Sequence, residues 1–324
     1  MVRYTIKRLL LTIPIIIIVA ILIFCIMKLT PGDPAKMILG DSATEEELQS
    51  YREYLGLNRP FLVQLGEYME RVFLHFDFGT SWLSRKSIAE EFAVRLPRSF
   101  AISCYSILVG ALFGIPLGVL AAVKQNTFAD KFILFLSSFM HVIPNYVWAL
   151  ILIIIFSVKL KWLPSYGADS WQCYIMPCAA IFIMGFTGMA RMTRSSMLEV
   201  IRSDYVMAAR AQGFSKRSVN YRHALPNAMI PVITALGTQF SHALGGTMIL
   251  ETIFSIPGTG TYIQGAISNR DLPIVTGTVI ILAIWFCLVM LLVDLLYAAL
   301  DPRIKAQYEA RNRTWKRKEK EAKA

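Results

Sequence analysis

Residues 205–228 of the chain read YVMAARAQGFSKRSVNYRHALPNA and lie between two long apolar segments. The stretch is basic and rich in alanine. Ser203 and Asp204, just before it, are typical of a helix start, because serine can cap the first turn and an acid favours the positive helix end. Gly213 is placed to end that helix in a left-handed conformation, and Ser215 can cap a second helix. The stretch therefore predicts a short surface helix, a sharp turn and a second helix on one side of a membrane.

The composition of the 324-residue chain is that of a multi-span membrane protein. Hydrophobic residues make up 55% of it and charged residues 17%, whereas soluble domains carry about 25% charged residues. Six apolar segments are long enough to cross about 30 Å of hydrocarbon as helices. We predict an all-α membrane protein with six transmembrane helices, at 9–27, 100–123, 132–158, 175–189, 228–250 and 274–300.

The first apolar segment has a basic start and could also be read as a secretory signal peptide. Its apolar run is longer than a typical signal core, and no cleavage site of the small-x-small type follows it. We therefore interpret it as a retained helix.

The distribution of Lys and Arg predicts the orientation. With the N-terminus inside, the inner segments hold 21 of the 33 basic residues. The outer segment 28–99 also carries 11 Asp and Glu, and loops of that length contribute little to the orientation rule. The bias predicts that both termini lie inside. The inner segments are 1–8, 124–131, 190–227 and 301–324.

We expect three parts along the chain. Residues 1–99 form a transmembrane helix followed by an external helical loop. Residues 100–300 form the core transmembrane domain, with short cytoplasmic helices at about 200–225. Residues 301–324 form a basic cytoplasmic tail, which we interpret as solvated rather than as a binding site for RNA or anionic lipid.

The external loop has the pattern of a small helical region. Ser42 or Thr44 can cap a helix with acids in its first turn, and Pro60 is expected to break that helix. Apolar residues then recur at helical spacing over 61–76. The region is too short to be a catalytic domain.

Glycines recur every fourth residue in the second predicted span, at Gly110, Gly114 and Gly118. On a helix they line one face and allow a neighbouring helix to approach closely. We expect this face to pack inside the bundle.

A few polar residues lie within the predicted spans. His141 and Asn145 lie one helical turn apart beside Pro144, and His242 lies in the fifth span. They are candidates for lining a transport pathway, although they could also form interhelical hydrogen bonds. Asp294 lies near the inner end of the last span, which favours an interfacial or structural role.

The reactive residue types predict no catalytic site and no metal site. The five cysteines form no CxxC pair. The four histidines are scattered, and the sequence contains no HExxH and no GxSxG. We expect a protein that is not an enzyme.

The opening stretch resembles the coupling motif of bacterial ABC importer permeases: Glu-Ala-Ala, three residues, Gly, nine residues, then Ile-x-Leu-Pro. Met207 stands where that Glu would be, and His223 where the Ile would be. The Glu is often missing in the peptide/nickel branch of the family, so its absence weakens only an ion pair with the ATPase. The matching positions are Ala208, Ala209, Arg210, Gly213, Leu225 and Pro226.

Further stretches resemble the dipeptide/oligopeptide/nickel branch of this family over nearly the whole chain. The long outer loop is more similar to the first of the two paired permeases than to the second. The stretches are TPGDP at 30–34, DFGTS at 77–81, RMTRSSM at 191–197, ETIFSIPGTG at 251–260, LVDLLY at 292–297 and LDPR at 300–303.

The resemblance implies a type I ABC importer permease fold in the bacterial cytoplasmic (inner) membrane. It implies a second homologous permease, two cytosolic ATPases that each dock one coupling helix, and an extracytoplasmic binding protein. ATP and Mg²⁺ would bind to the ATPases, because this sequence contains no GxxxxGK[ST] phosphate loop. We therefore expect no cofactor on this chain and no nucleic-acid partner.

The same resemblance favours di- or oligopeptides as the transported solute. Nickel or another small solute is the alternative, and a nickel pathway would plausibly use His141 and His242 as ligands. An ion-coupled secondary transporter, a different class, would usually carry ionisable residues near mid-membrane and internal repeats. Acids near mid-span are nearly absent here, and no convincing repeat is visible.

Overall fold

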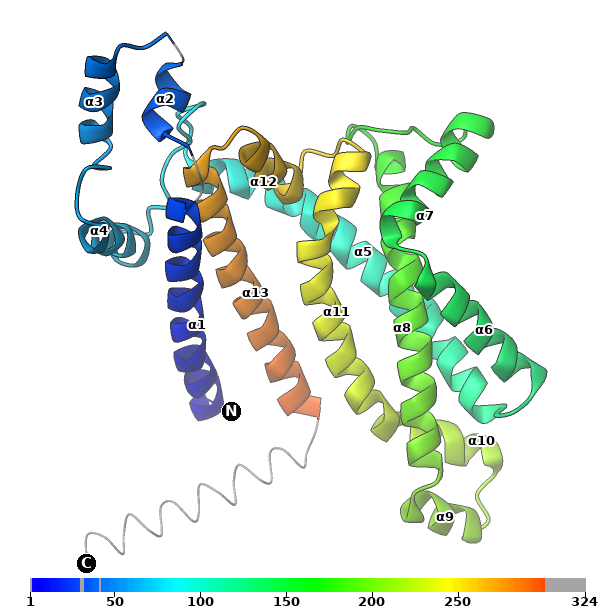
Figure 1. The fold of residues 1–324 in the computed structure, drawn as a ribbon. Coiled ribbons are helices and arrows are strands. Elements are labelled where there is room, and N and C mark those ends of the chain that lie inside the picture. Colours follow the sequence, from blue (N-terminus) through cyan, green and yellow to red (C-terminus); the bar gives the residue numbers. More distant parts are fainter. Residues whose placement is uncertain (1, 30–31, 41, 301–324) are drawn as a thin grey trace, which may run out of the picture. The chain divides into compact units, whose positions relative to one another are not determined.

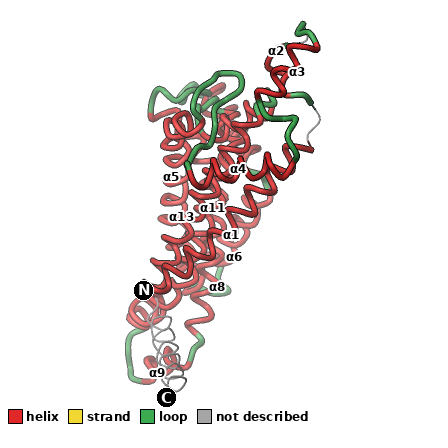
Figure 2. Tube along the Cα trace, turned by 90° about the vertical axis from the view of Figure 1, so that its left-hand side faces the viewer, coloured by secondary structure: helices red, strands yellow, loops and turns green. Residues whose placement is uncertain are grey.

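The chain is helical along nearly all of its described length (Figures 1 and 2). The structure, a computed structural model, describes residues 2–29, 32–40 and 42–300. The predicted basic tail at 301–324 and the Thr30-Pro31 pair of the outer turn lie outside these residues. The all-helical prediction is confirmed.

The chain divides into two compact units. One contains Phe100–Ile256 together with residues near both chain ends, and the other contains Leu9–Ser99 and Pro257–Cys287. The main helices of the first unit are the C-terminal part of α5 (Ile88–Val123), α6 (Phe128–Val142), the short α7 (Asn145–Leu152), α8 (Ile175–Ile201), α11 (Leu225–Ile253) and the C-terminal part of α13 (Leu272–Leu300).

The second unit holds most of the first helix and the predicted outer helical region. A core cluster buries Ala20 against Tyr68, Val72 and Ile280, so α1 packs with α4 and α13. The helices of this unit are α1 (Val2–Leu29), α2 (Pro34–Leu39), α3 (Glu45–Tyr54), α4 (Phe61–Leu74), α12 (Thr259–Ser268) and the N-terminal parts of α5 and α13.

Several helices are long and apolar enough to cross a membrane. Within the described residues there are four: Leu10–Leu29, Ile88–Val123, Trp171–Ile201 and Leu272–Val293. The bent pair α6 and α7 makes a fifth if it is one span. The predicted span at 228–250 lies in α11, a 29-residue helix that is not among these. The multi-span prediction is confirmed, and the count of six stays a prediction.

The predicted third span, 132–158, is broken near its middle. α6 and α7, which continues as a π-helical turn at Ile153–Lys159, enclose an angle of 92°. Ile143 has an extended backbone, with φ −84° and ψ 121°. Pro144 causes this, because its ring disfavours the helical conformation of the preceding residue and it has no N–H to donate. The predicted segment 132–158 is therefore a bent pair of helices, and its crossing of the membrane as one span stays a prediction.

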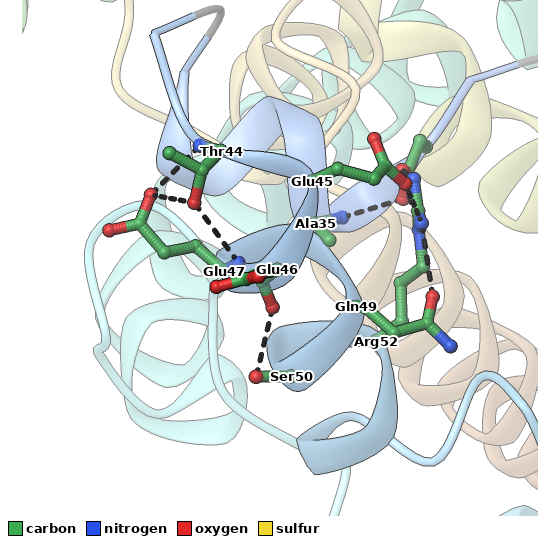
Figure 3. A network of polar contacts seen from close by, with 9 residues as sticks. Ala35, Thr44, Glu45, Glu46, Glu47, Gln49, Ser50 and Arg52 are labelled. Atoms are coloured by element: carbon green, nitrogen blue, oxygen red, sulfur yellow. Dashed lines mark hydrogen bonds and ion pairs between the residues drawn. The ribbon is translucent and has the colours of Figure 1, made fainter.

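The outer helix α3 begins as the sequence predicts. Thr44 accepts a hydrogen bond from the backbone N–H of Glu47, and the Glu47 carboxylate accepts one from the N–H of Thr44 (Figure 3). This reciprocal pair is a capping box, which satisfies two donors that the first turn would otherwise leave free.

The same helix ends earlier than expected. Gly56 adopts φ +68°, its N–H bonds the Glu53 carbonyl at 3.0 Å, and the N–H of Leu57 bonds the Arg52 carbonyl at 2.9 Å. This pair of bonds is a Schellman motif, which stops a helix at a left-handed glycine. The prediction that Pro60 breaks the helix is corrected, because Gly56 has already ended it.

The glycine face of α5 packs closely on α8. A Cβ atom at Gly114 would lie 2.7 Å from Cβ of Met189, and one at Gly118 would lie 2.6 Å from the Ala190 carbonyl oxygen. Both distances are too short for a real side chain, so only glycine allows this approach. The predicted packing role of the glycine face is confirmed.

Candidate coupling site

Two short helices connect α8 to α11. They are α9 (Asp204–Ala211) and α10 (Lys216–Ser218), and a π-helical turn at Val219–Ala224 leads into α11 (Figure 1). The prediction of a helix, a turn and a second helix in this stretch is confirmed.

The turn after α9 depends on Gly213. This glycine has φ +85°. Its N–H bonds the Arg210 carbonyl at 3.0 Å, and the N–H of Phe214 bonds the Ala209 carbonyl at 3.4 Å. The two bonds form a second Schellman motif, so the predicted left-handed helix end is confirmed.

The two predicted caps differ in their bonding. Ser215 accepts a hydrogen bond from the N–H of Ser218 at 3.3 Å, as expected. Ser203 has the extended backbone of a cap residue, but its hydroxyl donates to the Val200 carbonyl at 2.6 Å. The side-chain cap expected at Ser203 is therefore absent, and this serine instead closes the last turn of α8.

The inner face of the connecting helices packs on the ends of α5 and α8. Burial of these small and branched side chains fixes the orientation of α9 and of the turn before α11 relative to both long helices. The buried cluster contains Val119, Ala122, Met197, Val206, Ala209, Val219, Ala224 and Ala228.

The outer face of the same helices is exposed and partly apolar. Met207 is 50% exposed, and Phe214 is 48% exposed with its ring 5.1 Å from that of His223. A Cβ atom at Gly213 would meet nothing within 4 Å. Tyr205 is also exposed, and its hydroxyl accepts a hydrogen bond from the Asn227 amide. A partner can therefore reach the turn and the apolar side chains around it.

The structure divides the six residues of the predicted coupling motif between two roles. Ala208, Arg210, Gly213 and Pro226 are exposed. Ala209 is a member of the buried cluster, and Leu225 packs against that cluster. The first group can meet a partner, whereas Ala209 and Leu225 hold the segment on the bundle.

The candidate pathway residues lie around the bend between α6 and α7. Nδ1 of His141 lies 3.3 Å from the Thr187 hydroxyl, which donates to the Met184 carbonyl. This contact joins α6 to α8, and which group donates in it depends on the histidine tautomer. Asn145 is the first residue of α7 and is partly exposed. The side chains of His242 and Asp294 lie outside those that the structure describes.

A buried ion pair near the coupling helices was not among the sequence-based candidates. Nε of Arg194 donates to one carboxylate oxygen of Asp130 at 2.6 Å, and Nη2 donates to the other at 2.8 Å. Asp130 is 2% exposed and also accepts the backbone N–H of Asn126. Arg194 lies in the RMTRSSM stretch that resembles the family, but nothing in the sequence linked it to Asp130.

Comparison with known families matches nearly the whole chain. Residues 114–306 match the family described as binding-protein-dependent transport system inner membrane component. Residues 1–103 match the N-terminal family of the same membrane components.

Curated relatives and solved structures agree with these matches. The glutathione transport system permease protein GsiC of Salmonella typhimurium is 41% identical over 305 residues, which cover 94% of this chain and 99% of the relative. GsiC of Escherichia coli is 38% identical over the same coverage. The inward-facing MetNI methionine ABC transporter superposes with a TM-score of 0.54 at 18% identity, covering 65% of this chain and 96% of that chain.

Proposed function

This chain belongs to the family of binding-protein-dependent transport system inner membrane components, and we propose that it forms one half of an importer pore for short peptides, glutathione among them. As a member of this family it is a permease subunit of an ABC importer, an inner membrane protein and not an enzyme. Its fold is that of the type I importer permeases. Family membership sets aside the alternative of an ion-coupled secondary transporter.

The proposed partners are those of a complete importer. A second, homologous permease would supply the other half of the pore. Two cytosolic ATPases would bind ATP and Mg²⁺, because this sequence has no phosphate-binding loop. A binding protein outside the membrane would deliver the solute.

One observation supports the proposed coupling role. The turn at Gly213 is exposed, and the helix α9 that precedes it packs its other face against the bundle. The outer face of α9 offers Met207 and the open space around Gly213 to a partner. The inner face is buried against α5 and α8. A force applied to α9 by an ATPase would therefore move the ends of two long helices as one body, which is how alternating access by rigid-body motion operates.

Met207 indicates which kind of ATPase surface would bind the coupling helix. The motif has Glu at this position, and Met here removes an ion pair from the interface. The exposed thioether of Met207 and the exposed ring of Phe214 instead favour an apolar pocket on the ATPase, since methionine adapts its shape to such surfaces. Ala208 and Arg210 would lie at the rim of this contact.

The proposed solute follows from the relatives. The relatives that share 38–41% identity with this chain are named glutathione permeases, and glutathione is a tripeptide. Short peptides in general share its amide and terminal charges. Nickel remains the second candidate, with His141 as the described side chain that could face it.

Uptake by the reconstituted importer tests the proposal. Vesicles would contain this chain, its partner permease, both ATPases and the binding protein, and would receive glutathione, a dipeptide mixture or Ni²⁺ in turn. We expect ATP-dependent accumulation of glutathione or peptides. Accumulation of Ni²⁺ alone would overturn the solute assignment, and no accumulation with any solute in assembled vesicles would count against the pore itself. Vesicles without binding protein are the control.

A further inference from the structure

We propose that Asp130 and Arg194 are positioning residues that transmit motion of the coupling helices to α6 and to the bend at Pro144. The inference rests on the proposed function, because it takes α9 as the site where the ATPase acts. It adds a path from that site into the membrane part of the bundle.

The pair is built as a rigid connection between two helices. Asp130 lies in the first turn of α6, and Arg194 lies 64 residues later in α8. The two parallel hydrogen bonds, at 2.6 and 2.8 Å, fix both the distance and the orientation of the groups. The N–H of Asn126 adds a third bond at 2.9 Å, so the connection also includes the turn between α5 and α6.

The same part of α8 holds the coupling helix. Met197, one helical turn after Arg194, is fully buried in the cluster that contains Val206 and Ala209 of α9. Residues three apart on a helix are neighbours on its surface. A displacement of α9 therefore moves the segment of α8 that binds Asp130.

A second polar contact fastens the other end of α6 to α8. Nδ1 of His141, in the last turn of α6, lies 3.3 Å from the hydroxyl of Thr187 in α8. Along its length, α6 exposes a row of aromatic side chains. Because both ends of α6 contact α8, a movement of α8 moves α6 with it. The movement then reaches the 92° bend between α6 and α7. The exposed row contains Phe128, Phe132, Phe135 and Phe139.

Burial makes the pair sensitive to small chemical changes. Removing one partner leaves a charge without compensation in a site with little water, which disrupts local packing. Lysine at position 194 would keep the charge but would lose the planar two-bond geometry. The two substitutions Asp130→Asn and Arg194→Lys therefore separate the charge from the geometry.

The test compares transport with ATP hydrolysis in the complete reconstituted importer, using glutathione as the probe solute. For Arg194→Lys and Asp130→Asn we expect ATPase subunits to remain bound and hydrolysis stimulated by binding protein to change little. We expect solute uptake per ATP hydrolysed to fall by about tenfold or more, a size typical of coupling between sites. Asp130→Glu should retain more uptake than Asp130→Asn.

The control is a carboxylate whose ion pairs are local in the sequence. Glu91→Gln removes a carboxylate that pairs with Arg95, four residues further along α5, and with Lys86, just before that helix, and it should leave uptake per ATP unchanged. An unchanged ratio in both pair variants would overturn the inference, and so would a proportional fall of uptake and hydrolysis, which indicates a purely structural role. Loss of bound ATPase would also overturn it, because the pair would then act in docking.

The failure of this inference can be distinguished from the failure of the coupling assignment. If α9 is not the docking site, a bulky residue at Gly213 will leave ATPase binding and uptake intact. If only the present inference is wrong, that substitution will abolish uptake while the pair variants transport normally.

Discussion

The Ser81 hydroxyl donates a hydrogen bond of 2.5 Å to the Asp271 carboxylate, 190 residues further along the chain. The other contacts of this carboxylate are the backbone N–H groups of Trp82 and Leu83, at 3.2 and 3.3 Å. Asp271 is 2% exposed and directly precedes α13. These hydrogen bonds hold the turn that contains the DFGTS stretch against the start of α13.

Replacing Asp271 by Ala should detach this turn. The substitution leaves the Ser81 hydroxyl and two backbone N–H groups without their acceptor; the Ser81 hydroxyl is buried, and a buried group left unsatisfied costs about 1–3 kcal/mol. We expect a lower melting temperature in detergent and faster tryptic cleavage after Arg85 and Lys86. The control is Asp77→Ala, because the exposed Asp77 carboxylate accepts one backbone bond, from Gly79. Equal melting temperatures for the two variants would contradict this account.

Alanine at the glycines of α5 should destabilise the bundle in an order set by the available space. At Gly110 the nearest atom to an added Cβ is 3.2 Å away, whereas at Gly114 and Gly118 it is 2.7 and 2.6 Å away. Overpacking of this kind costs about 1–3 kcal/mol. We expect Gly110→Ala to be tolerated best, as measured by thermal unfolding of the purified protein in detergent.

Gly66→Ala is the matched control for the glycine series. Gly66 lies in helix α4, and an added Cβ there meets nothing within 4 Å. Because alanine favours a helix over glycine, this variant should be neutral or more stable by about 0.5–1 kcal/mol. Similar destabilisation at Gly66 and Gly118 would contradict this account, because an added Cβ meets close neighbours at Gly118 and none within 4 Å at Gly66.

The outer helical region should lose stability at acid pH. The Arg52 guanidinium and the Ala35 N–H hold the pKa of Asp33 below its ordinary value, and the Thr44 N–H and hydroxyl do the same for the pKa of Glu47 (Figure 3). A carboxyl group with a lowered folded pKa stabilises the fold fully above its unfolded pKa, near 4. That contribution is lost as pH falls through the lower folded value.

Hydrogen exchange over α3, corrected for the intrinsic effect of pH, measures this loss. Protection should be constant from pH 7 to about pH 5 and should fall below pH 4. Asp33→Asn should reduce protection at pH 7 and flatten its pH dependence. Glu46→Gln, in the same first turn, removes a charge near the helix start without removing a side-chain hydrogen bond, so it should lower protection less than Asp33→Asn. Full wild-type protection at pH 3 would contradict the assignment.

The features that the sequence predicted correctly depend on neighbouring residues. The start of α3 at Thr44 and the turn at Gly213 follow from preferences of single residues within one helical turn. The glycine face of α5 follows from a regular spacing. Each can be recognised without knowing what lies across the bundle.

The features that the sequence did not predict depend on distant partners or on competing local signals. Asp130 and Arg194 are 64 residues apart, and a single sequence carries no information on their pairing. At the end of α3 two stop signals were present, Gly56 and Pro60, and the earlier one decided the boundary. At Pro144 the sequence contains a residue that interrupts a helix, but the 92° angle between α6 and α7 does not follow from a single sequence.

The central claim is that the Gly213 turn couples this permease to an ATPase, and a pair of glycine substitutions tests it most directly. Gly213 and Gly40 both have a positive φ, +85° and +86°, and an added Cβ meets nothing within 4 Å at either site. With ψ 173°, Gly40 lies in a region that is essentially confined to glycine, so leucine introduces at least as much backbone strain there as at Gly213. Gly213 lies in the proposed docking turn, whereas Gly40 follows α2 in the predicted outer loop.

The measurement is glutathione uptake, together with the amount of ATPase retained, in importers that contain Gly213→Leu or Gly40→Leu. Our account predicts that both variants insert into the membrane, that Gly40→Leu transports at close to the wild-type rate, and that Gly213→Leu loses uptake. Wild-type uptake by Gly213→Leu, or an equal loss in both variants, would contradict it.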